Sequence, residues 1–356
     1  MQTTPHPHAE LLATDPQGWT FWAWEIPLTL RHPWTTARDT TYAKRNLIVA
    51  VCRDGVTGYG EAPPLLRYDE TPEGCMQAAR SLAEACLSMP VWGFRQFLTR
   101  RNGVSGYMAA KSAVDAALLD WHGKKADLPL HAMLGLTGSR LPRTSYSIGI
   151  DTPDMVAQKV AEAEPFPILK VKLGGEHDKE IMTRIRAMTS KPLRVDANEG
   201  WAGPHEALAM CRFLEDLDVE MVEQPMPAKL VEEMRWMREK TRLPLFADES
   251  TYAVADLARL KGAFDGINIK LSKAGGPQAA LEKILLGRSL GLKIMIGCMI
   301  ESSLGITTAA QLGGLADYLD LDGNLLVSDD PFAGLTVVAG QPVLPHAPGL
   351  GVTPVA

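Results

Sequence analysis

The feature that most constrains the fold is a series of short apolar runs that repeats from residue 145 onwards. Eight of these runs lie about 22–28 residues apart, and amphipathic segments long enough for a helix separate them. The runs cover residues 145–150, 168–174, 193–200, 219–225, 243–250, 266–272, 292–299 and 318–323. Parallel strands need crossover connections of this length, so we expect an α/β barrel.

An open doubly wound sheet is the competing arrangement for the same alternation. Such a sheet usually collects its ligand groups at one switch point. Here, however, polar residues follow nearly every apolar run, as in "VDANEGW" (195–201), "VEQP" (222–225) and "ADES" (247–250). Because all strand ends of a closed barrel meet at one mouth, the recurrence favours the barrel.

The residues that flank the barrel predict a second domain. Residues 1–18, rich in Pro and His, are expected to form a flexible tail. Residues 19–140 combine strand-like runs up to about Gly60, including an Asp-Gly turn, with Ala-rich helical segments, which predicts an α+β domain. The barrel then spans 141–329, and we expect residues from about 330 to 356 to return to the α+β domain.

Charge and cysteine content limit the class of protein. The net charge of −6 and the absence of a Lys/Arg cluster argue against nucleic-acid and membrane partners. The N-terminus lacks the basic and apolar regions of a signal peptide, and no apolar run is long enough to span a bilayer. The five cysteines are scattered and never in C-x-x-C spacing, as in reduced proteins. We therefore expect a cytoplasmic protein.

Three acidic residues end consecutive predicted strands. Asp196, Glu223 and Asp248 would meet at the barrel mouth and offer only oxygen ligands. Mg²⁺ prefers such ligands, and three carboxylates leave about three octahedral positions for water or a chelating substrate. The sequence therefore predicts a Mg²⁺ site at which Mn²⁺ could substitute.

Lysines end the strands on either side of this acidic set. Lys170 and Lys172 share a face of one strand, and Lys270 ends another strand. A nearby dication and a second ammonium lower the pKa of a lysine, which can then act as a general base. A substrate carboxylate chelated to the metal has an acidified α-proton. One lysine would remove this proton and another would return a proton to the opposite face, inverting the carbon.

These residues resemble the enolase superfamily in its muconate lactonising subgroup. The Lys-x-Lys pair, the three acids, Lys270 and a "PGLGV" segment (348–352) carry the resemblance, which spans nearly the whole chain. It implies a modified (β/α)₇β barrel with an α+β capping domain. It also implies that Lys172 and Lys270 are the acid/base pair, that Lys170 stabilises the enediolate, and that Asn198 and Glu249 orient the metal ligands.

Within the subgroup, "GCMIESSLGI" (297–306) and "LDLDG" (319–323) are similar to the dipeptide epimerases, with L-Ala-D/L-Glu as the best single substrate. The resemblance implies that Asp320 and Asp322 bind the ammonium of the dipeptide. Paired carboxylates suit a cationic amine. The remaining residues that we expect to line the substrate site are Ser147, Cys298 and Ile300.

Selectivity for the second residue is expected from the capping-domain loop 31–42. The resemblance implies that an arginine on this loop meets a glutamate side chain, and Arg38 is the candidate. Asp39 is adjacent and could face the pocket instead, which would favour a cationic or neutral dipeptide. Arg31 is a further option.

Two alternatives stay open. An o-succinylbenzoate synthase or a muconate-type cycloisomerase would keep the fold and the metal, but its substrate has no ammonium for Asp320 and Asp322. A non-catalytic metal- or ligand-binding barrel would not need lysines on both sides of the metal. The sequence therefore predicts a dipeptide epimerase, with a homo-oligomer as a further expectation that it does not decide.

Overall fold

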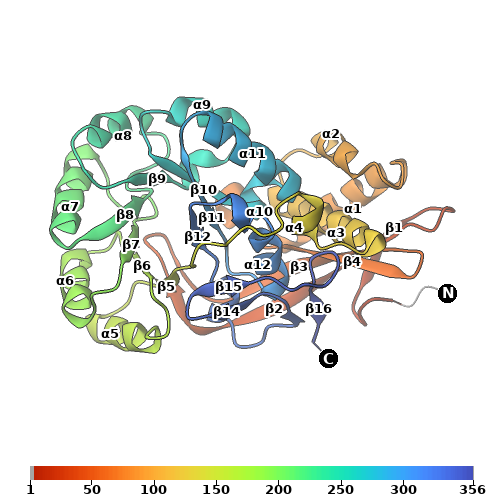
Figure 1. Cartoon of the computed structure of the whole chain (residues 1–356), viewed down its shortest axis with the longest axis horizontal. Coiled ribbons are helices and arrows are strands. Elements are labelled where there is room, and N and C mark those ends of the chain that lie inside the picture. Colours follow the sequence, from red (N-terminus) through yellow and green to blue (C-terminus); the bar gives the residue numbers. More distant parts are fainter. Residues whose placement is uncertain (1–3, 356) are drawn as a thin grey trace.

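A computed structural model describes residues 4–355; Met1, Gln2, Thr3 and Ala356 lie outside the described residues. The chain forms an antiparallel sheet with helices and a barrel of eight parallel strands (Figure 1). Both described ends of the chain lie on the side of the antiparallel sheet. The predicted α/β barrel with an α+β capping domain is confirmed; the exact domain limits stay a prediction.

The capping domain is built on four antiparallel strands in the order β1-β2-β3-β4. These strands are β1 (Glu10–Thr14), β2 (Thr20–Thr35), β3 (Thr40–Arg53) and β4 (Val56–Ala62). The helices of the domain are α1 (Pro72–Leu87), α2 (Phe97–Arg100), α3 (Met108–Ala126) and α4 (Leu130–Met133). Asp54 and Gly55 join β3 to β4 with φ values of 51° and 74°, as a two-residue hairpin turn requires.

The second half of β3, from Asn46 to Cys52, is buried on both faces because it separates two cores. Leu47, Val49 and Val51 pack with α1 and α3. The alternate residues Ile48 and Ala50 belong to a second cluster that includes Leu304 of the barrel helix α12 (Ser303–Ala310). The sheet thus joins the capping helices to the barrel.

Glycines in β4 allow α3 to approach the sheet closely. A Cβ atom on Gly60 would lie 2.0 Å from the carbonyl oxygen of Ala113, and one on Gly58 would lie 2.2 Å from that of Ala117. Both distances are impossible for real atoms. The strand therefore tolerates no side chain at these two positions.

Residues 1–18 were expected to form a flexible tail; residues 1–3 lie outside the described part of the chain, and the rest differs from that expectation. Residues Glu10–Thr14 form β1, which pairs with β2. Leu12 and Ala13 are buried in the capping core, and Arg80 of α1 donates hydrogen bonds to the carbonyls of Leu11 and Leu12. Only two apolar side chains are buried in β1, which is too weak a pattern to recognise among the surrounding polar residues.

The barrel strands follow one another in sequence order around the sheet. They are β5 (Tyr146–Ile148), β6 (Leu169–Lys172), β7 (Leu193–Asp196), β8 (Val219–Glu223), β9 (Leu245–Ala247), β10 (Gly266–Lys270), β11 (Lys293–Gly297) and β12 (Tyr318–Asp320). All eight lie within the apolar runs predicted from the sequence. An isolated parallel bridge between Thr144 and Leu319 joins the start of the first strand to the last.

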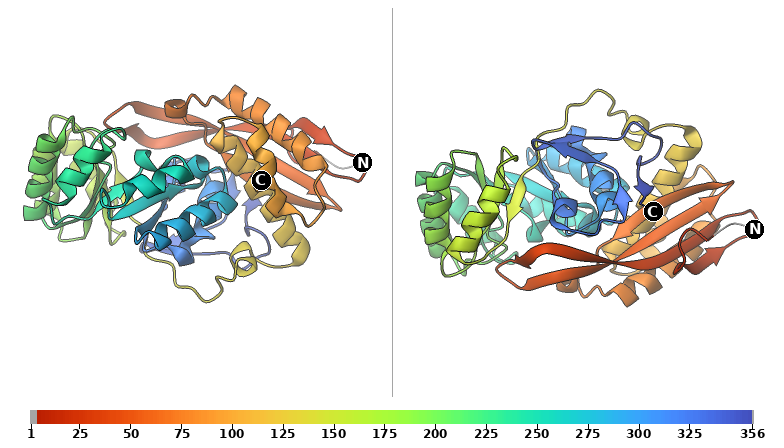
Figure 2. Two further views of the ribbon diagram at one scale, coloured as in Figure 1. Left: turned by 90° about the horizontal axis from the view of Figure 1, so that it is seen from above. Right: turned by 90° about the horizontal axis from the view of Figure 1, so that it is seen from below.

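Helices cover the outside of the barrel (Figures 1 and 2). They are α5 (Pro153–Glu162), α6 (Asp178–Met188), α7 (Pro204–Asp216), α8 (Val231–Arg238), α9 (Leu257–Leu260), α10 (Leu271–Ala274), α11 (Pro277–Ser289) and α12. Several begin with Pro at the first position, which suits a helix N-terminus. Among the described residues, no helix is long and apolar enough to cross a membrane.

The C-terminal segment returns to the capping domain. It contains the short strands β13 (Phe332–Ala333), β14 (Thr336–Val338), β15 (Gln341–Val343) and β16 (Thr353–Pro354). The amide of Leu350 donates to Asp120 of α3 at 2.7 Å, and the amide of Leu130 donates to the carbonyl of Gly349 at 2.7 Å.

Candidate active site

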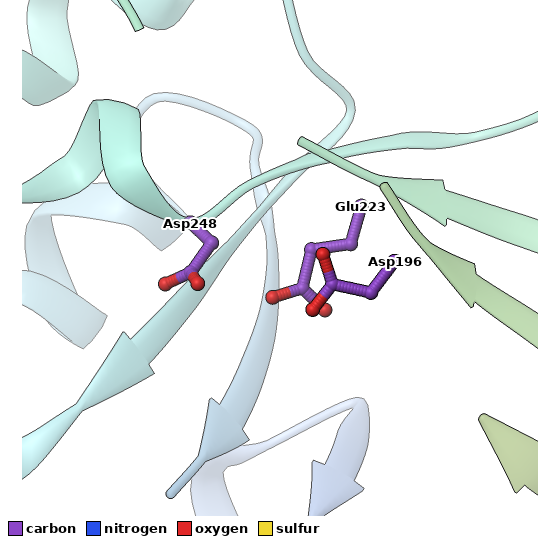
Figure 3. A group of neighbouring side chains, drawn as sticks. All are labelled: Asp196, Glu223 and Asp248. Atoms are coloured by element: carbon purple, nitrogen blue, oxygen red, sulfur yellow. The ribbon is translucent and has the colours of Figure 1, made fainter. Parts of the chain in front are cut away.

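Three carboxylates meet at the mouth of the barrel. Asp196 ends β7, Glu223 ends β8 and Asp248 follows β9, so that parallel strands place all three at one edge. One oxygen from each lies within 4.8 Å of the others, and all three residues are buried. Figure 3 shows the three carboxylates gathered together from neighbouring strand ends.

This set of donors fits a hard divalent cation. It consists only of carboxylate oxygens, which are the ligands that Mg²⁺ prefers. Burial and, after it, the negative charge of Asp196 raise the pKa of Glu223. Asn268 fixes Glu223 by donating from Nδ2 to Oε1 at 2.7 Å. The residues could therefore hold a Mg²⁺ ion.

Lysines approach the acidic cluster from both sides. On β6, Lys172 Nζ lies 2.6 Å from Oδ2 of Asp196. On β10, Lys270 Nζ lies 3.0 Å from Oδ2 of Asp248. Strands β7, β8 and β9, which lead to the acids, lie between these two strands. Both ammonium groups thus flank the place where a ligand of the cluster would lie.

Lys170 lies deeper than Lys172 on the same strand. Its Nζ contacts Glu223 at 2.7 Å, Asp196 at 3.1 Å and Asp320 at 2.7 Å. The side chain is almost fully buried. Its charge offsets part of the negative charge of the cluster. Its contact with Asp320 also connects the cluster to β12.

Carboxylates control the pKa values of the lysines in the protein without a bound metal. Burial lowers the pKa of Lys270, but Asp248 and Glu223 outweigh this effect and hold the pKa well above its ordinary value. Burial also acts on Lys170, where Asp320, Glu223 and Asp196 raise the pKa in the same way. The lowered lysine pKa was expected beside a bound dication and stays a prediction. A dication bound to the same carboxylates would offset their negative charge.

Asp320 and Asp322 differ in their partners. Asp320 accepts from Ser145 Oγ and from Lys170 Nζ, each at 2.7 Å. Asp322 accepts from the amide of Ser147 at 2.6 Å and has no ion-pair partner among residues 4–355. Burial and the nearby charge of Asp320 raise the pKa of Asp322 to about 7. Asp322 is therefore the carboxylate of the pair that is available to a cation.

A cavity of about 180 Å³ connects these groups to the capping domain. Its walls include Lys172, Lys270, Asp322 and, as expected, Ser147, Cys298 and Ile300. Cys298 donates from Sγ to the carbonyl of Asp320 at 3.2 Å. Burial and the charge of Asp322 hold the pKa of this thiol well above its ordinary value, so the thiol is a wall group rather than a nucleophile.

Asn198 and Glu249 lie beside the acidic cluster. The amide of Asn198 donates to Oδ1 of Asp196 at 3.0 Å, and its side chain donates to Glu249 at 3.3 Å. Both residues are buried. This chain of hydrogen bonds can hold Asp196 in place, which suits the orienting role that the sequence predicts for the two residues.

Loop residues of the capping domain close the cavity. Arg38 forms an ion pair with Glu249 and lies 3.5 Å from Glu199, so two carboxylates already face its guanidinium group. Asp39 also lines the cavity. Arg31 instead donates to the carbonyl of Leu325 and does not line this cavity. The role of Arg38 in substrate binding stays a prediction.

Several cavity and cluster residues are absent from the sequence-based prediction. Lys273, one helical turn after Lys270, donates to the side chain and to the carbonyl of Asp248. Its spacing from Lys270 could have revealed it. Lys44 and Tyr68 line the cavity from the capping domain, but no sequence pattern places that domain's loops over the barrel.

The chain is similar to known proteins over almost its full length. It is 42% identical over 337 residues to the L-Ala-D/L-Glu epimerase of Bacteroides thetaiotaomicron, covering 94% of this chain and 87% of the relative. The substrate-liganded structure of the L-Ala-D/L-Glu epimerase from Bacillus subtilis matches with a TM-score of 0.90 at 32% identity, covering 94% and 98% of the two chains.

A further solved structure carries a metal and a different dipeptide. The dipeptide epimerase from Cytophaga hutchinsonii, complexed with Mg and D-Ala-L-Val, matches with a TM-score of 0.90 at 29% identity. The match covers 95% of this chain and 96% of that one.

Family descriptions match both domains. Residues 154–356 match the enolase C-terminal domain-like family, and residues 23–135 match the N-terminal domain of the mandelate racemase / muconate lactonizing enzyme family. The first match alone covers more than half of the chain, and the predicted resemblance to the enolase superfamily is confirmed. The chain therefore belongs to the mandelate racemase / muconate lactonizing enzyme family of the enolase superfamily.

Proposed function

We propose that this protein is a Mg²⁺-dependent dipeptide epimerase that inverts the α-carbon of the C-terminal residue, with L-Ala-D/L-Glu as its substrate. The observation that carries the proposal is the placement of Lys172 and Lys270 on opposite sides of the acidic cluster. A 1,1-proton transfer needs one base on each face of the reacting carbon. The isomerase class also follows from homology to relatives named as dipeptide epimerases.

The acidic cluster would hold the metal, which fits the Mg complex of the Cytophaga hutchinsonii relative. When bound, Mg²⁺ would acidify the α-proton by stabilising the negative charge that develops on the substrate carboxylate. Lys170, in contact with two of the three acids, adds positive charge on the same side.

The proton transfers belong to the two flanking lysines. One neutral lysine takes the α-proton from its face, and the other, as an ammonium, donates a proton to the opposite face. The roles exchange when the other epimer is the substrate. Both side chains line the cavity and are buried, which limits proton exchange with bulk water.

The other end of the cavity suits the N-terminal amine of a dipeptide. Asp322 lies there with no ion-pair partner among the described residues, and Ser147 positions its carboxylate. A cationic amine would supply the missing partner. This feature favours a dipeptide over the substrates of o-succinylbenzoate synthase or a cycloisomerase, which carry no ammonium.

The side chain of the second residue would face the capping domain. Three cations of that domain line the cavity, namely Arg38, Lys44 and Arg67. Arg38 pairs with Glu249, and Arg67 pairs with Glu199 at 2.6 Å. Lys44 has no ion pair among the described residues, so it is the cation most able to receive a glutamate carboxylate.

Nuclear magnetic resonance in deuterated water tests the proposal. L-Ala-L-Glu with Mg²⁺ and the protein should lose its glutamyl α-proton signal and form L-Ala-D-Glu. A panel of dipeptides with acidic, neutral and basic second residues then ranks the substrates. The absence of exchange in every dipeptide would refute the epimerase and favour a non-catalytic binding barrel. The cytoplasmic location and the homo-oligomer stay predictions.

A further inference from the structure

Tyr68 lies where the capping domain meets the reacting groups. It ends the short 3₁₀ helix η1 (Leu66–Tyr68) in the connection between β4 and α1. Its ring stacks on that of Tyr252, with the ring centroids 4.2 Å apart and the planes inclined by 25°. Tyr68 lines the cavity together with Asp248 and Lys270, whereas Tyr252 does not line it.

The hydroxyl of Tyr68 is buried and has no hydrogen-bond partner among the described residues. A buried polar group without a partner costs free energy, so such groups are rare and usually acquire a partner in the functional state. Burial and the negative charge of Asp248 hold the pKa of this hydroxyl above its ordinary value. The group therefore stays protonated at neutral pH and can donate a hydrogen bond.

The position of Tyr68 around the barrel indicates its partner. The Tyr68 ring stacks on that of Tyr252, which caps the short 3₁₀ helix that follows Asp248 after β9. The amine of a dipeptide would lie near β12, beside Asp322, on a different part of the wall. Tyr68 thus lies on the side of the acidic cluster, where the substrate carboxylate would bind.

We propose that the Tyr68 hydroxyl donates a hydrogen bond to the carboxylate of the substrate's C-terminal residue. This inference rests on the proposed epimerase function. The carboxylate gains negative charge as the α-proton leaves, so a donor aimed at it stabilises the transition state more than the ground state. Tyr68 would then act on every dipeptide, whatever its second side chain.

A matched pair of variants tests this role. Tyr68→Phe removes the hydroxyl and keeps the ring stack, and Tyr252→Phe makes the same change in the stacked ring outside the cavity. We measure kcat and KM for epimerisation of L-Ala-L-Glu and L-Ala-L-Leu. Loss of a hydrogen bond to a charged group should lower kcat/KM of Tyr68→Phe by about tenfold or more on both dipeptides. Tyr252→Phe should match the wild-type protein.

Two outcomes overturn the inference while the epimerase proposal stands. One is a Tyr68→Phe variant that is as active as Tyr252→Phe. The other is a loss confined to L-Ala-L-Glu, which would place the hydroxyl against the second side chain. Calorimetric titration with the equilibrated epimers supplies a readout apart from turnover, because Tyr68→Phe should bind both dipeptides more weakly. Absence of both exchange and binding in the wild-type protein would instead refute the epimerase itself.

Discussion

Lys172 and Asp196 are partners in the register of β6 and β7, and their side chains meet at 2.6 Å. On the far side of the cluster, Lys270 contacts Asp248 at 3.0 Å, although the two residues are not register partners. Each lysine therefore lies next to a different carboxylate of one metal site. Parallel pairing places Lys172, Asp196 and Glu223 at one level of the mouth, whereas Asp248 and Lys270 lie further along their chains.

Removal of one base should separate proton exchange from inversion. We expect Lys172→Ala and Lys270→Ala each to abolish epimerisation, because a proton can no longer be returned to the opposite face. Each variant should keep slow exchange of the α-proton in one epimer only, and the two variants should prefer opposite epimers. The loss of the α-proton signal in deuterated water, followed separately for L-Ala-L-Glu and L-Ala-D-Glu, measures which epimer each variant exchanges. Exchange of the same epimer by both variants would contradict a two-base mechanism.

Metal removal should abolish activity and lower stability together. Chelation should stop α-proton exchange, and added Mg²⁺ or Mn²⁺ should restore it. A ligand that binds only the folded state raises the midpoint of thermal unfolding. This Mg²⁺-dependent shift should be present in the wild-type protein and lost in Glu223→Gln. Glu220→Gln is the matched control, because Glu220 lies on the same strand but pairs with Arg194 at 2.8 Å. Equal shifts in both variants would place the metal elsewhere.

The activity should fall at acidic pH through Asp322. Its pKa is raised to about 7, so its carboxylate is protonated below that pH and loses its attraction for the substrate ammonium. A profile of kcat/KM for L-Ala-L-Glu should therefore rise as the pH increases through about 7. Asp322→Asn should show low kcat/KM at every pH and lack this rise. A rise with an unchanged midpoint in Asp322→Asn would assign it to another group.

Selectivity for acidic dipeptides should depend on Lys44. Lys44→Met should lower kcat/KM for L-Ala-L-Glu by about tenfold and leave that for L-Ala-L-Gln nearly unchanged, because only the charge of the second side chain differs. Arg45→Met is the control: Arg45 follows Lys44 on β3 but is exposed and pairs with Glu25. A loss of Glu selectivity in Arg38→Met, with none in Lys44→Met, would instead support Arg38, which the sequence predicts as the determinant.

Stability should depend on the close contact between β4 and α3. Gly60→Ala would drive a Cβ atom into the Ala113 carbonyl and should lower the free energy of unfolding by about 1–3 kcal/mol or more. Gly103→Ala is the control, because its Cβ would meet no atom within 4 Å. Urea unfolding of both variants measures the difference. Equal stability would show that the helix shifts without cost.

The barrel could be predicted from the sequence because its signal is periodic and local. Polar residues stand at the end of each apolar run, and the strand ends meet at the mouth of the barrel. The order of the strands is therefore enough to bring Asp196, Glu223 and Asp248 together. Strand β1 could not be predicted in this way, since only Leu12 and Ala13 are buried in it and both depend on α1 for their environment.

The cavity residues that come from the capping domain were harder to predict than those from the barrel strands. Tyr68 and Lys44 come from a different domain, and their positions depend on how that domain sits on the barrel. The lysine pKa values also needed the structure, because the sign of the shift depends on which carboxylates lie within contact of Lys170 and Lys270. The order of the strands shows that the acids and lysines meet at the barrel mouth. It does not show whether the pKa of each lysine is raised or lowered there.

Glu61 of β4 accepts hydrogen bonds from the side chain of Asn46 and from Ser302 and Gly305 at the start of α12. One buried carboxylate thus fixes the capping sheet, including the strand β3 that carries Lys44, against the barrel. Lys44 is thereby held at a fixed place over the cavity, so a substitution of this residue should change which second residue of the dipeptide is accepted. The proton transfers, which belong to Lys172 and Lys270 on the barrel strands, would be unchanged.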